Sequence, residues 1–234
     1  MRMAIRWAAV VTWVAVVTLL ACAAPAGAQA PATQAVSTDQ AALDRRVTAF
    51  LDRMRFEWRD LNVPLADGQA LYDIIVKNNY KSALEIGTST GHSAIWIAWA
   101  LSKTGGKLVT VEIDERRHKQ ALENFREAGV AAYIDARLAD AHELVPKLEG
   151  PFDFVFIDAD KEWYTNYARA VIPRLTPGGC MAAHNVLAPG RSRAGGARMS
   201  GTAEYYEFMR ARDDFETTVL ERSSAGLAVS YKKK

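Results

Sequence analysis

Two carboxylates and one amine directly follow the apolar segment FVFI at residues 154–157. Asp158 and Asp160 end this segment, and Lys161 comes next. Side chains of these types at this spacing can hold a cation and can take a proton from a bound substrate. Strands also end in polar residues for purely structural reasons. The elements that position these three residues therefore decide between the two interpretations.

The chain from Lys81 onward alternates between apolar runs and segments with helical periodicity. A first helix is expected after Ser37, which suits a helix cap, and later helices at 91–101, 115–128, 141–148, 162–175 and 202–212. Strands separated by helices indicate βαβ units and a mainly parallel sheet covered on both faces. The sequence thus predicts one α/β domain of seven strands that ends in an antiparallel hairpin. The strands are expected at 82–87, 107–113, 132–139, 152–158, 179–185, 215–221 and 226–232.

Polar side chains occur near the ends of four predicted parallel strands. Glu85 and Glu112 lie near the ends of the first two, Asp158 ends the fourth, and His184 and Asn185 end the fifth. The carboxyl ends of parallel strands meet at one edge of a sheet, and ligands bind there, where the strand order reverses. We therefore expect these side chains to converge on one site.

The segment LEIGTSTGHS places a glycine turn, with Gly87 and Gly91, between a strand and a helix. Such a turn lets a ligand approach the backbone, and Glu112 on the next strand suits the hydroxyls of a ribose. The turn lacks the G-x-G-x-x-G pattern of dinucleotide sites, and Glu85 would repel a pyrophosphate. These residues favour S-adenosylmethionine (SAM), which has an ammonium, a sulfonium and no phosphate, over NAD.

Six segments occur in an order that resembles a known family. They are DLNVPLADGQAL, ALEIGTSTGHSA, VTVEID, FDFVFIDADKEWY, LTPGG and AHNVLAPG. Together they are similar to the metal-dependent O-methyltransferases of the catechol and caffeoyl-CoA group, from Asn62 to Tyr231. The resemblance implies a Rossmann-like SAM-methyltransferase fold. It also implies transfer of a methyl group from SAM to a hydroxyl of a small phenolic or catechol-like acceptor.

The resemblance assigns roles by position in these segments. Asp158 and Lys161 are the expected catalytic residues, with Lys161 as the general base for the acceptor hydroxyl. An ordinary solvated lysine at a helix start is the alternative for Lys161, and an ordinary helix residue is the alternative for His142. The expected SAM-binding residues are Asn62, Val63, Glu85, Gly87, Ser93, Glu112, Asp140, Ala141, His142 and Asp158.

A divalent cation is expected beside the acceptor, held by Asp158, His184 and Asn185. The family usually has Asp-Asn where this chain has His184 and Asn185, so an imidazole replaces one carboxylate. Oxygen ligands favour Mg²⁺, and an imidazole shifts the preference toward Mn²⁺ or a softer metal. Either His184 still ligates the metal, or the site is poor in metal or free of it.

The first 28 residues have the pattern of a secretory signal peptide. Arg2 and Arg6 precede an uncharged apolar stretch that ends in small residues. Cleavage, lipid attachment and retention as a membrane anchor are three possible fates of this leader. Residues 29–40 would form a linker, and residues 41–234 the O-methyltransferase domain. We expect an exported or membrane-anchored chain outside the cytoplasm, with a cytoplasmic chain as the alternative.

The charge of the remaining chain disfavours a nucleic-acid partner. The sequence has 29 basic and 27 acidic residues, and two of the basic ones, Arg2 and Arg6, lie in the leader. The rest is near neutral and offers no long-range field for nucleic acid. The expected partner is a small phenolic molecule, with membrane contact only through the leader. A homodimer through the first helix or the arginine-bearing loop 188–201 is a further expectation.

Two other functions fit parts of this pattern. An NAD(P)-dependent oxidoreductase could use the same strand order, although Glu85 and the missing third glycine disfavour it. A non-catalytic SAM-binding protein would keep the fold and lack turnover, and an exported location would separate it from the cytosolic supply of SAM. A comparison of SAM binding with NAD binding tests the oxidoreductase alternative. A measurement of methyl-transfer turnover tests the non-catalytic alternative.

Overall fold

The computed structural model describes the backbone of residues 32–58, 61–186, 201–221 and 223–234. The expected leader and almost all of the arginine-bearing loop lie outside these residues, so the expectations about them stay predictions. Within the described ranges, no helix combines the length and the apolar character that a membrane span requires.

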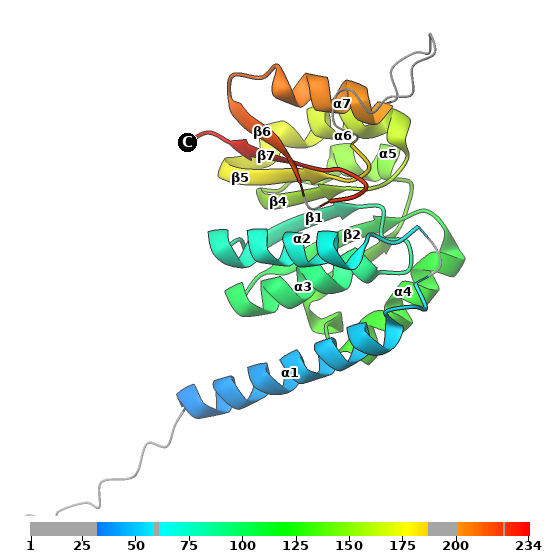
Figure 1. Ribbon diagram of the computed structural model, residues 1–234, viewed down its shortest axis with the longest axis vertical. Helices are drawn as coiled ribbons and strands as arrows, with labels where there is room; N and C mark the ends of the chain where they lie inside the picture. The colour runs from blue at the N-terminus through cyan, green and yellow to red at the C-terminus, as the bar shows by residue number, and fades with distance from the viewer. Residues whose placement is uncertain (1–31, 59–60, 187–200, 222) are drawn as a thin grey trace, which may run out of the picture.

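A single sheet of seven strands forms the centre of the described chain (Figure 1). Strands β1 to β5 run parallel, and β7 and β6 add an antiparallel pair at one edge. The predicted Rossmann-like fold with a C-terminal hairpin is therefore confirmed. Across the sheet the order is β3 (Ile134–Leu138), β2 (Lys107–Glu112), β1 (Ser82–Ile86), β4 (Phe152–Ile157), β5 (Leu175–Ala183), β7 (Leu227–Lys232) and β6 (Phe215–Leu220).

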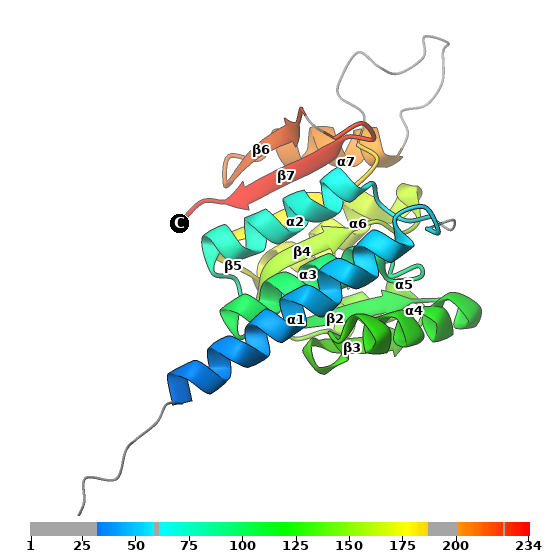
Figure 2. The same ribbon diagram turned by 60° about the horizontal axis from the view of Figure 1, so that its bottom comes forward.

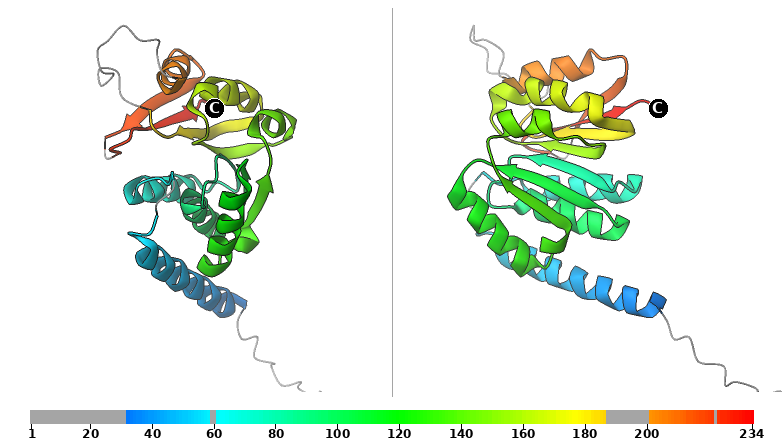
Figure 3. Two further views of the ribbon diagram at one scale, coloured as in Figure 1. Left: turned by 90° about the vertical axis from the view of Figure 1, so that its right-hand side faces the viewer. Right: turned by 180° about the vertical axis from the view of Figure 1, so that it is seen from behind.

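Two apolar layers cover the sheet, because each strand sends alternate side chains to opposite faces. Ala83 and Phe154 belong to the layer with α1 to α4, whereas Leu84 and Val155 belong to the layer with α5 to α7. Figure 3 shows α2 and α6 on opposite sides of the sheet. The helices are α1 (Ala32–Met54), α2 (Leu65–Asn78), α3 (His92–Thr104), α4 (Glu115–Ala128), α5 (Ala141–Leu144), α6 (Tyr164–Val171) and α7 (Gly201–Arg210).

Helix α1 packs against α3 and α4 on the outside of the first layer (Figure 2). Its Arg46 guanidinium donates to the carbonyl oxygens of Glu127 and Arg126, at 2.8 and 2.6 Å, at the C-terminal end of α4. The helix begins at Ala32, inside the segment 29–40 that we expected to be a linker. Alanine and glutamine recur in this segment and have high helix propensity, which explains the longer helix.

The strand order reverses between β1 and β4, and this reversal positions the site. Gly87 follows β1 and Asp158 follows β4, so the segments that leave these two strands meet at the reversal. Gly87 has a φ of 98°, and a Cβ atom on it would lie 2.5 Å from the carbonyl oxygen of Asp158. Glycine is therefore required here, because any side chain would strain the backbone and collide with the neighbouring connection.

Candidate active site

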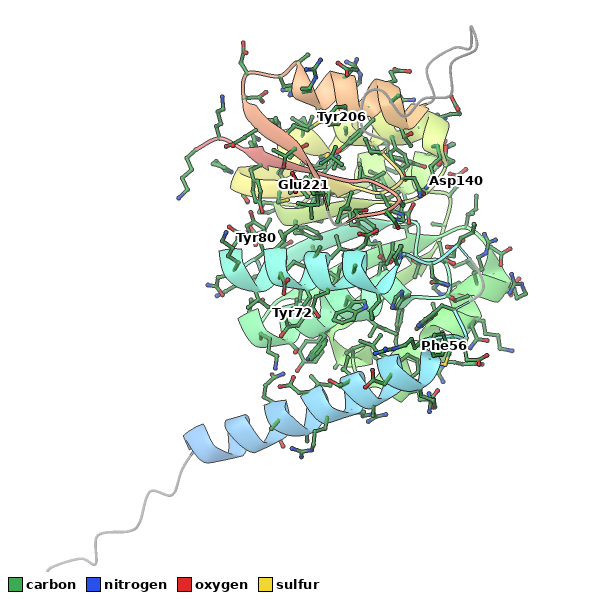
Figure 4. The ribbon with its side chains drawn as sticks, viewed as in Figure 1. Phe56, Tyr72, Tyr80, Asp140, Tyr206 and Glu221 are labelled. Carbon is green, nitrogen blue, oxygen red and sulfur yellow. The ribbon has the colours of Figure 1, made fainter. Side chains whose placement is uncertain are left out.

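A cavity of about 590 Å³ lies at the carboxyl ends of the parallel strands. Sites for small ligands usually measure roughly 300–1,000 Å³. Asp140, which lines the cavity, lies at the opposite end of the sheet from Tyr80, which precedes β1 (Figure 4). Most of the predicted site residues line this cavity: Asn62, Gly87, Glu112, Asp140, Ala141, His142, Asp158, Lys161, His184 and Asn185.

Three predicted SAM-binding residues, Val63, Glu85 and Ser93, are not among the residues that line the cavity. Val63 is buried, and its carbonyl oxygen accepts a hydrogen bond from Nδ1 of His92 at 2.9 Å. Ser93 is buried in the first turn of α3, and Glu85 is fully buried in β1. These three residues therefore support the wall of the cavity from behind.

Glu85 has a buried carboxyl group within the first layer of helices. The hydroxyl of Thr110 on β2 donates to Oε2 of Glu85 at 2.5 Å. Burial raises the pKa of Glu85 to about 8, and the charges of Asp158 and Glu112 add to this rise. The hydroxyls of Ser93 and Thr110 act in the opposite direction but do not outweigh burial. The carboxyl is therefore largely protonated at neutral pH.

Glu112 presents a fixed carboxylate at the end of β2. Its Oε2 accepts from the backbone N–H of Ser89 at 2.6 Å, and its Oε1 accepts from those of Ile113 and Asp114 at 3.1 and 3.0 Å. Each carboxylate oxygen has two lone pairs, so Oε2 can still accept one further hydrogen bond from a ligand. A carboxylate held in this way suits the adjacent hydroxyls of a ribose.

His142 lines the cavity and is held by its neighbours. Asp140 caps α5 by accepting from the backbone N–H of His142 at 2.8 Å. The His142 ring stacks on Trp163 with centroids 3.7 Å apart, and its Nε2 lies 3.0 Å from Oδ2 of Asp160. Tyr167 donates its hydroxyl hydrogen to Oδ1 of Asp160 at 2.7 Å. This arrangement fixes the imidazole beside a space that suits a planar ring.

Asp158, Lys161 and Tyr164 form a compact polar group at the cavity. Lys161 Nζ lies 2.6 Å from Oδ1 of Asp158 and 2.9 Å from the Tyr164 hydroxyl. The Tyr164 hydroxyl also donates to Oδ1 of Asp158 at 3.2 Å. Burial raises the pKa of Tyr164 well above its usual value, and the Asp158 charge adds to the rise. Tyr164 therefore stays protonated and acts as a hydrogen-bond donor.

His184, which follows β5, bridges two carboxylates. Its Nε2 lies 3.0 Å from Oδ2 of Asp67 on α2, and its Nδ1 lies 3.2 Å from Oδ2 of Asp158. Ser223 also donates to Oδ2 of Asp67 at 3.0 Å. Burial lowers the pKa of His184, but hydrogen bonds and charges from Asp158 and Asp67 outweigh burial and raise it to about 9. The ring is therefore positively charged at neutral pH.

The three predicted metal ligands meet at the cavity, but the donor atoms of two of them, Asp158 and His184, already face other side chains. Both nitrogens of His184 face carboxylate oxygens, whereas a metal ligand needs a nitrogen lone pair directed at the ion. Oδ1 of Asp158 is already bonded to Lys161. Across the described ranges, no group of three or more His, Cys, Asp or Glu side chains is arranged to hold a metal ion.

Sequence reasoning missed several residues of the site. Asp67 is an acidic residue in the first turn of α2, a position where carboxylates usually favour the helix dipole and face solvent. Its burial becomes visible only in the fold, where it meets His184 and Ser223. Ser89, Asp160 and Tyr167 also line the cavity. Ser89 and Asp160 stand in segments that we singled out, whereas Tyr167 has no distinctive pattern.

Comparison with known proteins agrees with this geometry. The sequence model of a family described as O-methyltransferase matches residues 35–217. A catechol O-methyltransferase from Niastella koreensis is 33% identical over 148 residues, which cover 60% of this chain and 66% of the relative. A caffeoyl-CoA O-methyltransferase from Zinnia elegans is 34% identical over 149 residues, which cover 61% and 58%. The match thus spans less than two thirds of the length of these curated relatives.

A solved structure has the same architecture. It is the O-methyltransferase from Bacillus cereus in complex with SAH, with a TM-score of 0.70 and 26% identity over 84% of this chain and 97% of that chain. The family model covers well over half of the present sequence, including every strand from β1 to β5. The chain therefore belongs to the O-methyltransferase family.

Proposed function

We propose that this chain is a SAM-dependent O-methyltransferase that moves a methyl group to a hydroxyl of a small phenolic or catechol-like acceptor. One observation carries this proposal. A single cavity joins Glu112, which suits ribose hydroxyls, to Asp158 and Lys161, which suit a reacting hydroxyl. The Bacillus cereus relative was solved with SAH, the demethylated form of SAM, and two relatives are named for phenolic acceptors.

The proposed SAM site runs along the strand ends. Glu112 would accept hydrogen bonds from the ribose, and His142 would border the adenine. Asp158 lies at the strand reversal and offers negative charge near the sulfonium and the ammonium of SAM. Gly87 lets the ligand approach the backbone because it has no side chain. This arrangement favours a positively charged donor over a pyrophosphate.

In the proposed reaction, the bond between sulfur and the methyl carbon breaks while the bond from the acceptor oxygen to that carbon forms. The sulfonium becomes a neutral thioether, and the hydroxyl proton passes to Lys161. To take this proton, Lys161 must react as its neutral amine, and its side chain, which is 38% exposed, can then pass the proton to solvent. The transfer removes charge from the donor, so the main contribution of the site is alignment of the two reactants.

The divalent cation implied by the sequence resemblance has no part in this proposal and stays a prediction. Its expected ligands are Asp158, His184 and Asn185, and the pairing of His184 with two carboxylates disfavours it. The proposed chemistry therefore assigns roles only to side chains of this protein.

Titration calorimetry with SAM and with NAD tests the proposed cofactor. We expect heat from SAM and none from NAD. Glu112→Gln should weaken SAM binding by about tenfold or more, because one hydrogen-bond acceptor for the ribose is lost. Glu143→Gln is the matched control, since Glu143 is exposed and pairs only with Lys147 among the contacts described. Binding of NAD instead of SAM would support the oxidoreductase alternative.

We also propose that the leader takes the chain out of the cytoplasm. The apolar stretch after Arg2 and Arg6 supports this location. Fractionation of cells that express the full chain tests it, because an exported or anchored chain leaves the cytoplasmic fraction. Recovery in that fraction would contradict the proposal.

The homodimer stays a prediction, and sedimentation of the full chain tests it.

A further inference from the structure

His184 stands between two carboxylates that reach it from different elements. Asp67 comes from the first turn of α2, and Asp158 follows β4. The side chains of His184, Asp67 and Asp158 are only 5%, 1% and 10% exposed. Water therefore contributes little to the stability of these charges, which depends on the side chains around them. Asp158 also pairs with Lys161 and Tyr164, and Asp67 also accepts from Ser223.

The geometry around His184 defines which form of the ring fits. A neutral imidazole has one N–H donor and one acceptor nitrogen, so it can satisfy only one of two facing carboxylates. A ring with N–H groups on both sides satisfies Asp67 at 3.0 Å and Asp158 at 3.2 Å together. A ring that carries N–H groups on both sides is thus the form that pairs with both buried carboxylates at once.

We propose that the His184 ring, held between Asp67 and Asp158, takes the place of the divalent cation, so that this chain transfers methyl groups without added metal. The proposal rests on the methyl-transfer function proposed above. It assigns Asp67 a positioning role, because this carboxylate holds the side of the ring that points away from Asp158.

A charged ring supplies one part of what a divalent cation would supply. His184 lines the cavity beside Lys161, so its positive charge stabilises negative charge that develops on an acceptor oxygen. The ring offers no open coordination positions, whereas a divalent ion can bind two adjacent oxygens at once. A vicinal pair of hydroxyls therefore gives no binding advantage here. The expected acceptors include phenols that carry a single hydroxyl.

Turnover with and without metal tests this inference on the full chain. The protein is treated with EDTA, dialysed, and assayed by mass spectrometry with SAM and two matched acceptors, caffeate and p-coumarate, which differ by one hydroxyl. We expect methylated product from both acceptors and rates that change by less than about twofold when EDTA, Mg²⁺ or Mn²⁺ is added. Loss of turnover in EDTA with recovery in Mg²⁺ or Mn²⁺ would overturn the inference. Methylation of caffeate alone would overturn the expectation that phenols with a single hydroxyl are acceptors.

Titration of Mn²⁺ by calorimetry gives a readout that does not depend on turnover. The wild-type chain should give no binding heat, whereas His184→Asp, which recreates the Asp-Asn pair of the family, should bind Mn²⁺. Stoichiometric Mn²⁺ binding by the wild type that His184→Ala abolishes would make His184 a metal ligand and overturn the inference. If His184→Asp does not fold, the wild-type titration still shows whether the chain binds Mn²⁺. Absence of product under every metal condition, despite SAM binding, would instead refute the proposed function.

Discussion

Asp158 connects two nitrogen-bearing side chains of the site. One of its oxygens faces Lys161 and the other faces His184. The carboxylate therefore fixes both groups at the wall of the cavity. At the scale of single residues, the chemistry of this chain depends on these two contacts.

Lys161 is the residue whose removal should affect turnover most selectively. Lys161→Ala removes the proposed base, so we expect kcat to fall by about 100-fold or more. Affinity for SAM should change by less than about twofold, because Lys161 itself makes none of the contacts proposed for SAM, which involve Glu112, His142 and Asp158. Product formation and calorimetry measure the two quantities. Lys147→Ala, at an exposed pair with Glu143, is the control, and an unchanged kcat in Lys161→Ala would remove Lys161 from the mechanism.

Glu85 should make the stability of the protein depend on pH. The folded chain keeps the carboxyl proton up to about pH 8, whereas the unfolded chain loses it near pH 4.5. The unfolded state thus binds fewer protons in this window, and the free energy of unfolding falls as the pH rises through it. Glu85→Gln should remove this fall. Thermal unfolding at several pH values measures it, and parallel curves for variant and wild type would contradict the assignment.

At the scale of elements, one carboxylate of α1 links this helix to α3. Asp44 of α1 accepts a hydrogen bond from Nε1 of Trp99 at 2.8 Å and pairs with Lys103, both on α3. Burial of Asp44 opposes its charge, but hydrogen bonds from Lys103, Trp99 and Gln40 outweigh burial and lower its pKa. The carboxylate thus forms a specific contact between two helices.

Loss of this contact should destabilise the fold measurably. Asp44→Ala should lower the free energy of unfolding by about 1 kcal/mol, a modest value because the side chain is 36% exposed. Asp52→Ala is the control. Asp52 and Arg55 form an exposed ion pair at the C-terminal end of α1, and this pair should contribute almost nothing to the free energy of unfolding. Urea unfolding followed by circular dichroism measures both. Equal effects in the two variants would show that α1 does not depend on Asp44.

The boundaries of elements show what the sequence could predict. Apolar runs predicted all seven strands, because a sheet covered on both faces needs apolar side chains on both. Two helices were predicted to be longer than they are. The helix predicted at 141–148 changes to a 3-10 turn at Val145, and the helix predicted at 162–175 changes to a 3-10 turn at Ile172. Pro146 and Pro173 explain the change, because proline has no N–H for a helical hydrogen bond.

The site could be predicted where strand ends define it, and not where tertiary packing defines it. Glu112 and Asp158 follow apolar strands, so their convergence follows from the parallel sheet. Asp67 lies on a helix, and its contact with His184 spans 117 residues of sequence. Burial of Glu85 depends on Thr110 and the helices above it. No local pattern in the sequence encodes either contact.

At the scale of the whole molecule, two apolar layers hold the sheet rigid and leave its carboxyl edge open. The strand reversal between β1 and β4 brings Gly87 and Asp158 together there. The cavity thus joins a region suited to a ribose and a planar ring with a region suited to a reacting hydroxyl. This continuity is the structural basis of the proposed methyl transfer.

The most direct test is a mass-spectrometric assay of the full chain with SAM and a panel of catechols, flavonoids and hydroxycinnamates. The account predicts that at least one acceptor gains one methyl group and that SAH appears in equal amount. Appearance of neither, while calorimetry shows that SAM is bound, would contradict the account and would identify the chain as a non-catalytic SAM-binding member of its family.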